Sequence, residues 1–113
     1  MAARIARGDV RLFQLPTPDK MRPVVVLTRN SAISLLSTVT VAPITSTIRG
    51  VPSEVRLNED DGMKGPCAVN LHNVIIVRQD LMGKRVAQLG SRRMNELCAA
   101  LQFAVGCDFS ETT

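Results

Sequence analysis

The sequence predicts a small, mainly β domain that ends in one α-helix. Short runs of alternating or continuous apolar residues recur from Asp9 to Leu89, and loops rich in Pro, Gly, Asn and Asp separate them. After Leu89 the apolar residues recur at helical spacing as far as Gly106. Many short strands followed by one helix are typical of a small β-barrel or rolled sheet with an attached helix.

Length and composition set the limits of this prediction. The chain has 113 residues and is 45% hydrophobic, so we expect a single folded domain, residues 1–113. No apolar run approaches the roughly 20 residues that span a bilayer, and the first residues lack the apolar region of a signal peptide. We therefore expect no membrane association and a cytoplasmic location. Three cysteines without C-x-x-C spacing also favour a reducing compartment.

The first half of the chain contains three expected strands. The alternating run "DVRLFQL" begins at Asp9, and the loop "PTPDK" ends it. The continuous apolar run in "RPVVVLT" indicates a central strand, which Pro23 can begin without loss of an interior ladder bond. "NSAISLLS" predicts a helical turn or an irregular connection. "TVTVAPIT" is the third strand, and we expect Pro43 to bend or end it.

The second half contains shorter strands and the helix. In "EVRL" we expect Val55 and Leu57 to point inward. The acidic segment "NEDDGMKGP" predicts a solvated turn, "CAVNLHNVIIV" one or two strands split near residues 70–73, and "RVAQL" a short last strand. Ser91 is the expected N-cap of the helix, and Gly106 lies where a glycine ends one.

Two strand ends carry residues suited to phosphate binding. Arg22 begins the second strand, and Thr45 ends the third. If these strands pair antiparallel, the two residues lie at the same edge. A guanidinium and several hydroxyls would then meet there, and both donate hydrogen bonds to phosphate oxygens. The alternative is a polar turn after the third strand, and pattern alone favours that alternative.

His72 is the only histidine, and it lies between Asn70 and Asn73 at a strand break. Imidazole ordinarily titrates near a pH of about 6.5, which suits a general acid or base. A hydrogen-bonded surface histidine is the simpler interpretation. One histidine and no thiol pair give no indication of a transition-metal site, and the known nucleotide-binding and hydrolase motifs are absent.

Several segments together resemble the MazF/PemK family, the toxin halves of bacterial toxin–antitoxin modules. These segments, in the order of the family, are "RGDVRLFQL", "KMRPVVVLTRN", "VAPITSTIRGVPSEVRL", "CAVNLHNV" and "MNELCAALQFAVGC", a domain core of about residues 7–106. The resemblance implies an SH3-like β-barrel with a C-terminal helix, usually a homodimer. It also implies a sequence-specific, ribosome-independent endoribonuclease that cuts single-stranded RNA with neither a metal nor another cofactor. The expected partner is an antitoxin whose acidic tail occupies the RNA groove.

The resemblance also implies roles for individual residues. Arg22, followed by proline, matches the catalytic arginine of the family, and Thr45 matches its catalytic threonine. The implied reaction is attack of the ribose 2′-OH on the adjacent phosphate. It yields a 2′,3′-cyclic phosphate, which can open to a 3′-phosphate, and a 5′-OH end. The general base is left open, with His72 as a candidate. Residues expected to bind RNA are Lys20, Ser46, Thr47, Arg49, Asn70 and Asn73.

Two other functions are compatible with the same fold. One is a toxin that poisons DNA gyrase by binding, as CcdB does, and the other is a barrel that binds nucleic acid without cutting it. Fold alone does not separate these functions. The pair Arg22 and Thr45 favours the nuclease, because a protein that only binds has no need of it.

Overall fold

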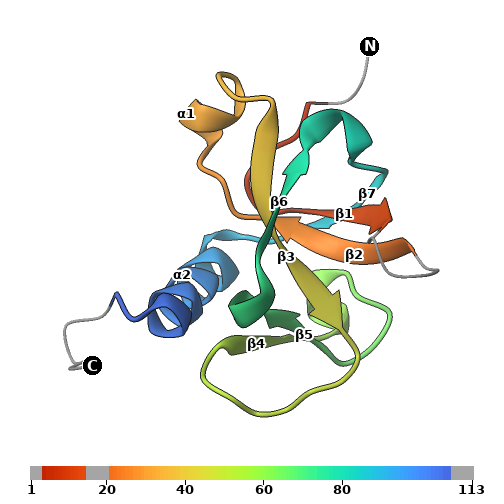
Figure 1. The fold of residues 1–113 in the computed structure, drawn as a ribbon. Coiled ribbons are helices and arrows are strands. Elements are labelled where there is room, and N and C mark those ends of the chain that lie inside the picture. Colours follow the sequence, from red (N-terminus) through yellow and green to blue (C-terminus); the bar gives the residue numbers. More distant parts are fainter. Residues whose placement is uncertain (1–3, 15–20, 108–113) are drawn as a thin grey trace.

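The computed structural model describes residues 4–14 and 21–107, and its chain forms one curled antiparallel sheet with a helix against it (Figure 1). Along the sheet the strands follow the order β4-β5-β3-β2-β1-β7, and β6 pairs with β3. The strands are β1 (Asp9–Gln14), β2 (Met21–Val26), β3 (Thr38–Thr45), β4 (Glu54–Leu57), β5 (Cys67–Asn70), β6 (Ile75–Arg78) and β7 (Arg85–Gln88). The predicted class, a mainly β fold with one C-terminal helix, is confirmed.

Short helices fill the connections, and one long helix ends the fold. They are α1 (Asn30–Ile33), the 3-10 turns η1 (Glu59–Asp61), η2 (Leu71–Asn73) and η3 (Gln79–Leu81), and α2 (Ser91–Val105). α2 packs on η2 and β4 through the buried side chains of Met94, Leu97 and Ala100. Among the described residues, no helix is both long and apolar enough to cross a membrane.

The continuous apolar run of β2 is explained by two hydrophobic clusters. Val25 belongs to the cluster that α2 covers, whereas Val24 and Val26 belong to the second cluster, with Phe13 and Val39. Because successive side chains of a strand point to opposite faces, a strand between two apolar clusters needs apolar residues at every position. β2 lies between β1 and β3, as expected for a central strand.

Pro43 does not end the third strand, which continues to Thr45. β3 pairs with β6 from Thr38 to Val41 and with β5 only at Ile44 and Thr45. Pro43 therefore lies in the interval between these two partners, where its missing N–H interrupts neither of the two ladders. The strand thus ends at Thr45, as the segment "TVTVAPIT" predicted, and Pro43 marks the change of its partner strand rather than its end.

The predicted helix cap at Ser91 is also wrong. The N-cap is Gly90 in an extended conformation, Ser91 is the first helical residue, and no side chain caps this end. Gly106 ends the helix as predicted, with a left-handed φ of 73°. Its N–H donates to the carbonyls of Gln102 and Phe103.

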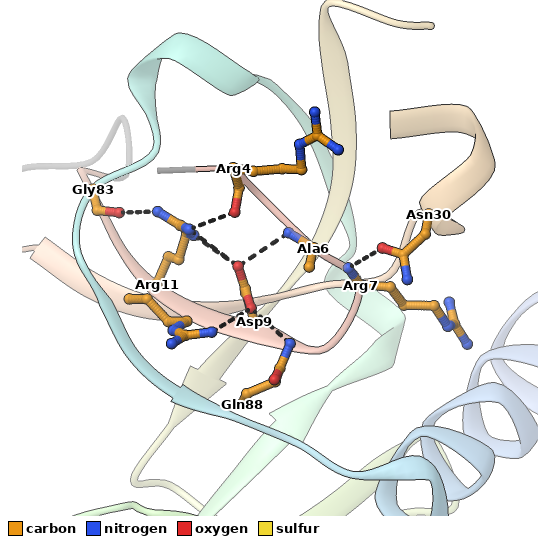
Figure 2. A network of polar contacts seen from close by, with 9 residues as sticks. Arg4, Ala6, Arg7, Asp9, Arg11, Asn30, Gly83 and Gln88 are labelled. Carbon is orange, nitrogen blue, oxygen red and sulfur yellow. Dashed lines mark hydrogen bonds and ion pairs between the residues drawn. The ribbon is translucent and has the colours of Figure 1, made fainter. Parts of the chain in front are cut away.

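A buried polar network ties the N-terminal segment to the sheet (Figure 2). Asp9 and Arg11 are 0% and 6% exposed, and their side chains form an ion pair at 3.1 Å. The carboxylate of Asp9 also accepts hydrogen bonds from the backbone N–H of Ala6 and the amide of Gln88. Arg11 donates to the backbone carbonyl of Gly83 at 3.0 Å. Each charge is thus paired and hydrogen-bonded, as buried charges must be.

Candidate functional site

The antiparallel pairing of β2 with β3 brings Arg22 and Thr45 to the same edge. The last pair of this ladder is Val24 with Pro43. When the same register is continued by two residues, Arg22 lies opposite Thr45. Both residues line one cavity of about 860 Å³. Clefts of about 300–1,000 Å³ are typical ligand sites. The predicted juxtaposition of the two strand ends is therefore present in the structure.

The cavity is positively charged. Its lining includes Arg22, Lys64 and Lys84 but neither Asp nor Glu. None of these three cations takes part in an ion pair within the described part of the chain. Unpaired cations around a concave surface attract an anionic ligand and strengthen its binding.

The hydroxyl of Thr45 is oriented by the loop that follows it. Its Oγ1 accepts a hydrogen bond from the backbone N–H of Thr47 at 3.1 Å. A hydroxyl has one proton to donate and two lone pairs, so the proton of Thr45 is free to reach an anionic oxygen in the cavity. Ser46 lines the same cavity beside Thr45.

The rest of the cavity wall is apolar without being aromatic. Met21, Met63, Pro66 and Val86 lie in it, and Met21 is 51% exposed. Thioethers make favourable contacts with aromatic rings. The wall thus presents flat or flexible apolar surface of the kind that a nucleobase can cover.

Cys67 also lines the cavity, but the electrostatic environment of its thiol disfavours the nucleophilic thiolate. Burial, together with the nearby carboxylate of Asp61, raises the pKa of this thiol above its usual range. A thiol in that environment stays protonated at neutral pH and is a poor nucleophile.

The loop after Thr45 is held by one carboxylate. Glu54 accepts hydrogen bonds from the backbone N–H groups of Arg49, at 3.0 Å, and Gly50, at 2.9 Å. Burial acts to raise the pKa of Glu54, but the backbone donors, Gly50 first, outweigh it and lower the pKa. Thr47 and Arg49 are exposed, and neither lines the cavity.

His72 lies outside the cavity lining and contacts a different part of this loop. Its Nδ1 is 2.6 Å from the Oγ of Ser53, whose side chain is buried. Asn70 is 9% exposed, and its side-chain oxygen accepts the backbone N–H of His72, which caps η2. Asn73 is exposed at the end of η2. The structure therefore does not bring this cluster together with Arg22.

Sequence reasoning identified one edge of the cavity and missed the other. Lys64 and Lys84 are isolated in the sequence, and only the fold brings them beside Arg22. The glycines on either side of Lys64, in "GMKGP", were the only local signal. Lys20, which was expected to bind RNA, lies outside the described residues.

A second, shallower groove lies between β4 and α2. It measures about 550 Å³ and is lined by residues of both charges, including Arg56, Glu54, Arg93 and Glu96. Arg93 is already engaged, since it donates to Asp61 at 3.0 and 3.1 Å and to Glu96 at 2.8 Å. The positive cavity is therefore the better candidate for an anionic ligand.

The arrangement in the positive cavity is suited to phosphoryl chemistry. A guanidinium and a hydroxyl from neighbouring strands can both donate to the oxygens of one phosphate. Donors fixed before the reaction stabilise the charge that develops on those oxygens in the transition state.

Comparison with known proteins gives a consistent result. The sequence profile of the "PemK-like, MazF-like toxin of type II toxin-antitoxin system" family matches residues 6–105. The probable endoribonuclease MazF5 of Mycobacterium tuberculosis is 42% identical over 108 residues, which are 95% of this chain and 98% of the relative. The probable endoribonuclease MazF2 of the same species is 33% identical over 89% of this chain and 98% of the relative.

Solved structures agree with the fold. The Mycobacterium tuberculosis toxin MazF-mt6 superposes with a TM-score of 0.80 at 33% identity, covering 89% of this chain and 99% of that chain. A mycobacterial endoribonuclease in complex with its cognate antitoxin has a TM-score of 0.84 at 24% identity, over 93% of this chain and 98% of that chain. Since the family profile spans nearly the whole chain and a relative is 42% identical, this chain belongs to the PemK-like, MazF-like toxin family of type II toxin–antitoxin systems.

Proposed function

We propose that this chain is an endoribonuclease that cuts single-stranded RNA and acts as the toxin of a toxin–antitoxin pair. One observation carries the proposal: Arg22 and Thr45 lie opposite each other at the edge of a cavity whose charged residues are all cationic. The related proteins named as endoribonucleases support it, at 33% to 42% identity. A gyrase poison has no need of a phosphate site, so this alternative is not favoured.

In the proposed reaction the ribose 2′-OH attacks the adjacent phosphorus, and the bond to the 5′-oxygen breaks. The 2′-proton leaves to a base, and the 5′-oxygen gains a proton to become a 5′-OH. Arg22 binds the non-bridging oxygens and stabilises their growing charge, a role that suits its planar fork of donors. Thr45 donates its free hydroxyl proton to one of the same oxygens.

The other predicted residues take supporting roles in this proposal. Ser46 lines the cavity and can bind the same phosphate, whereas Thr47, Arg49 and Asn73 lie outside the lining, on exposed surface that RNA entering or leaving the site can contact. Lys20, two positions before Arg22 in the sequence, is also proposed to bind RNA. The contacts of His72 with Ser53 and of Asn70 with the backbone of His72 favour a positioning role for both.

The proposal has a direct biochemical test. Purified protein is incubated with a long single-stranded RNA in the presence of EDTA, and the 5′ ends of the products are mapped. We expect discrete cuts at a short motif and products with 5′-OH ends, and we expect both Arg22→Ala and Thr45→Ala to abolish them. Intact RNA together with inhibited DNA supercoiling would instead indicate a gyrase poison. RNA that is retained but not cut would indicate a binding protein.

We also propose three features of the protein in the cell. Its partner is an antitoxin with an acidic tail that competes with RNA for the positive cavity. Its location is the cytoplasm, where RNA is available to it. Its native form is a homodimer, and four exposed apolar side chains near α1 and β6, those of Leu35, Leu36, Ile76 and Leu81, support this assembly.

A further inference from the structure

We propose that Lys64 and Lys84 each bind a backbone phosphate of the RNA strand, next to the phosphate held by Arg22 and Thr45. The inference rests on the proposed function, because it takes RNA as the ligand of the cavity. Both lysines line the cavity with Arg22, yet they come from segments far apart in the sequence. The loop between η1 and β5 carries Lys64, and the turn between η3 and β7 carries Lys84.

The backbone at Lys84 is fixed on both sides. The carbonyl of Lys84 accepts the N–H of Leu12 at 3.1 Å, and the N–H of Gly83 donates to the carbonyl of Leu12 at 2.9 Å. Arg11, held in its buried ion pair with Asp9, donates to the carbonyl of Gly83 (Figure 2). A methyl group at Gly83 would lie 2.7 Å from the Leu12 carbonyl oxygen, so this approach requires glycine. Lys84 therefore extends from a rigid base.

The loop of Lys64 is fixed independently. Asn58 and Asp61 cap η1 reciprocally, and Asp61 also receives the guanidinium of Arg93 from α2. Gly62 then turns the chain with a φ of 90°, so close to β7 that an added Cβ would lie 3.0 Å from the Cβ of Ala87. The two lysines are thus presented by two anchored segments, which reduces the entropy lost when a ligand is bound.

The cavity suits a nucleic-acid strand better than an acidic peptide. Its cations alternate with apolar surface contributed by Met21, Met63 and Val86. Every nucleobase has a flat π-face that can cover such surface, and methionine sulfur contacts aromatic rings favourably. Lysine ammonium groups pair with phosphates as point charges without demanding one orientation. A tail of acidic side chains would use the cations but leave the apolar wall uncovered.

Salt dependence tests the inference. The probe is a fully 2′-O-methylated 20-nucleotide RNA of mixed sequence, which cannot be cut because its 2′ oxygens are blocked. Its dissociation constant is measured over a series of NaCl concentrations. For single strands each phosphate contact contributes about 0.7 to the slope of log Kd against log salt. We therefore expect Lys64→Gln and Lys84→Gln each to reduce the slope by about 0.7, and the double variant by about 1.4.

Arg29→Gln is the matched control. Arg29 is exposed beyond the other end of β2, is absent from the cavity lining, and forms no ion pair among residues 4–14 and 21–107. Its substitution removes the same charge and should leave the slope unchanged. Thermal melts confirm that each variant is folded; Lys64→Arg and Lys84→Arg, which keep the charge, should restore the slope.

The outcomes separate this inference from the proposed function. Unchanged slopes in both lysine variants, with RNA still cut by the wild-type protein, would overturn the inference alone. If the lysine variants have reduced slopes but the wild-type protein does not cut unmodified RNA, the proposed nuclease activity is overturned, whereas the proposed phosphate contacts of the lysines are supported. Poly-glutamate serves as a model acidic peptide. If the lysine variants lose affinity for poly-glutamate while their salt slope for RNA equals that of the wild type, the lysines bind an acidic peptide rather than RNA, and the inference is overturned.

Discussion

Arg22 is an exposed guanidinium on a buried strand, so its substitution should change activity and leave the fold intact. Removal of one donor to the developing charge typically costs about 10²–10³-fold in rate, and we expect Arg22→Ala to lose at least that much. Arg22→Lys keeps the charge but loses the planar fork, so it should rescue little. The measurement is the initial rate of RNA cutting, with Arg29→Ala as the control. Activity near that of the wild type in Arg22→Ala would rule out the proposed mechanism.

Thr45 is expected to act through its hydroxyl rather than through its shape. Its Oγ1 already accepts the N–H of Thr47, so the proton is what remains for the substrate. Thr45→Ser keeps this proton and should keep most of the activity, whereas the isosteric Thr45→Val should lose about 10²-fold or more. Single-turnover rates on one RNA compare the two variants. Equal rates for serine and valine would show that the hydroxyl takes no part in the reaction.

His72 is expected to position the loop rather than move the proton of the 2′-OH. Its ring nitrogen contacts the buried hydroxyl of Ser53, and it does not line the cavity. His72→Gln should therefore lower the rate by a similar factor at every pH, and Ser53→Ala should reproduce the effect. The readout is the rate between about pH 5.5 and 8.5, the range over which an ordinary imidazole changes charge. A rate profile that loses its acidic limb only in His72→Gln would instead identify His72 as the base.

At the scale of elements, an ion pair connects α2 to the loop that carries Lys64. Arg93 donates to both carboxylate oxygens of Asp61, and their side chains are 17% and 10% exposed. Partial burial acts to raise the pKa of Asp61, but hydrogen bonds from Arg93 and the backbone of Asn58 outweigh it and lower the pKa. The bond to Asp61, with a second to Glu96, raises the pKa of Arg93. The charged pair thus fixes η1 on the helix.

This pair gives a stability prediction with a definite sign. Because the pKa of Asp61 is lower in the folded state, its contribution is present at neutral pH and is lost as the pH falls through the folded pKa. Asp61→Asn should reduce the free energy of unfolding by about 1–2 kcal/mol at pH 7, and the difference should vanish in acid. Urea denaturation at several pH values measures it. Asp60→Asn, an exposed neighbour, should show neither effect.

The strands were well predicted from the sequence, because burial of a strand face requires apolar residues at regular positions along the chain. "EVRL" and "TVTVAPIT" match β4 and β3 residue for residue, and the continuous run of β2 indicated its central place. The ends of elements were less predictable. Ser91 was the expected N-cap of α2, but the N-cap is Gly90. Gly90 has an extended backbone, and the helix begins after it without a hydrogen bond from a capping side chain.

The candidate site was predictable only where two strand ends meet. The prediction was conditional: Arg22 and Thr45 share an edge only if the second and third strands pair antiparallel, and the structure meets that condition. Lys64 and Lys84 line the same cavity because the sheet curls and because two anchored turns carry them there. Neither the curl nor the turns produce a periodic pattern of residues in the sequence. The contact of His72 with Ser53 spans 19 positions and likewise has no local trace.

At the scale of the whole molecule, the end formed by α1 and β6 has the properties of an interface. Ile76 and Leu35 are 72% and 82% exposed, and the Gln79 amide ties the two segments together through the carbonyls of Ile33 and Leu36. In Figure 1, α1 and β6 lie above β4 and β5, which are at the bottom of the view. Apolar surface gathered in this way is typical of association sites.

A substitution on this surface tests the homodimer. Ile76→Asp places a charge where the second copy would pack, and we expect it to shift the protein from dimer to monomer in sedimentation velocity. Val105→Asp is the control, because Val105 is 59% exposed at the end of α2. A dimer that persists in Ile76→Asp would place the interface elsewhere.

The buried pair of Asp9 and Arg11 bears on how the chain can be shortened or extended at its beginning. Ile5 packs in the core, and Ala6 and Arg4 supply backbone partners to the pair. A chain shortened to begin at Arg7 would leave two desolvated charges with fewer partners, and the change would reach Gly83 and Lys84 through Arg11. A purification tag that replaces residues 4–6 would have the same effect. A tag at the other terminus, beyond α2, avoids it.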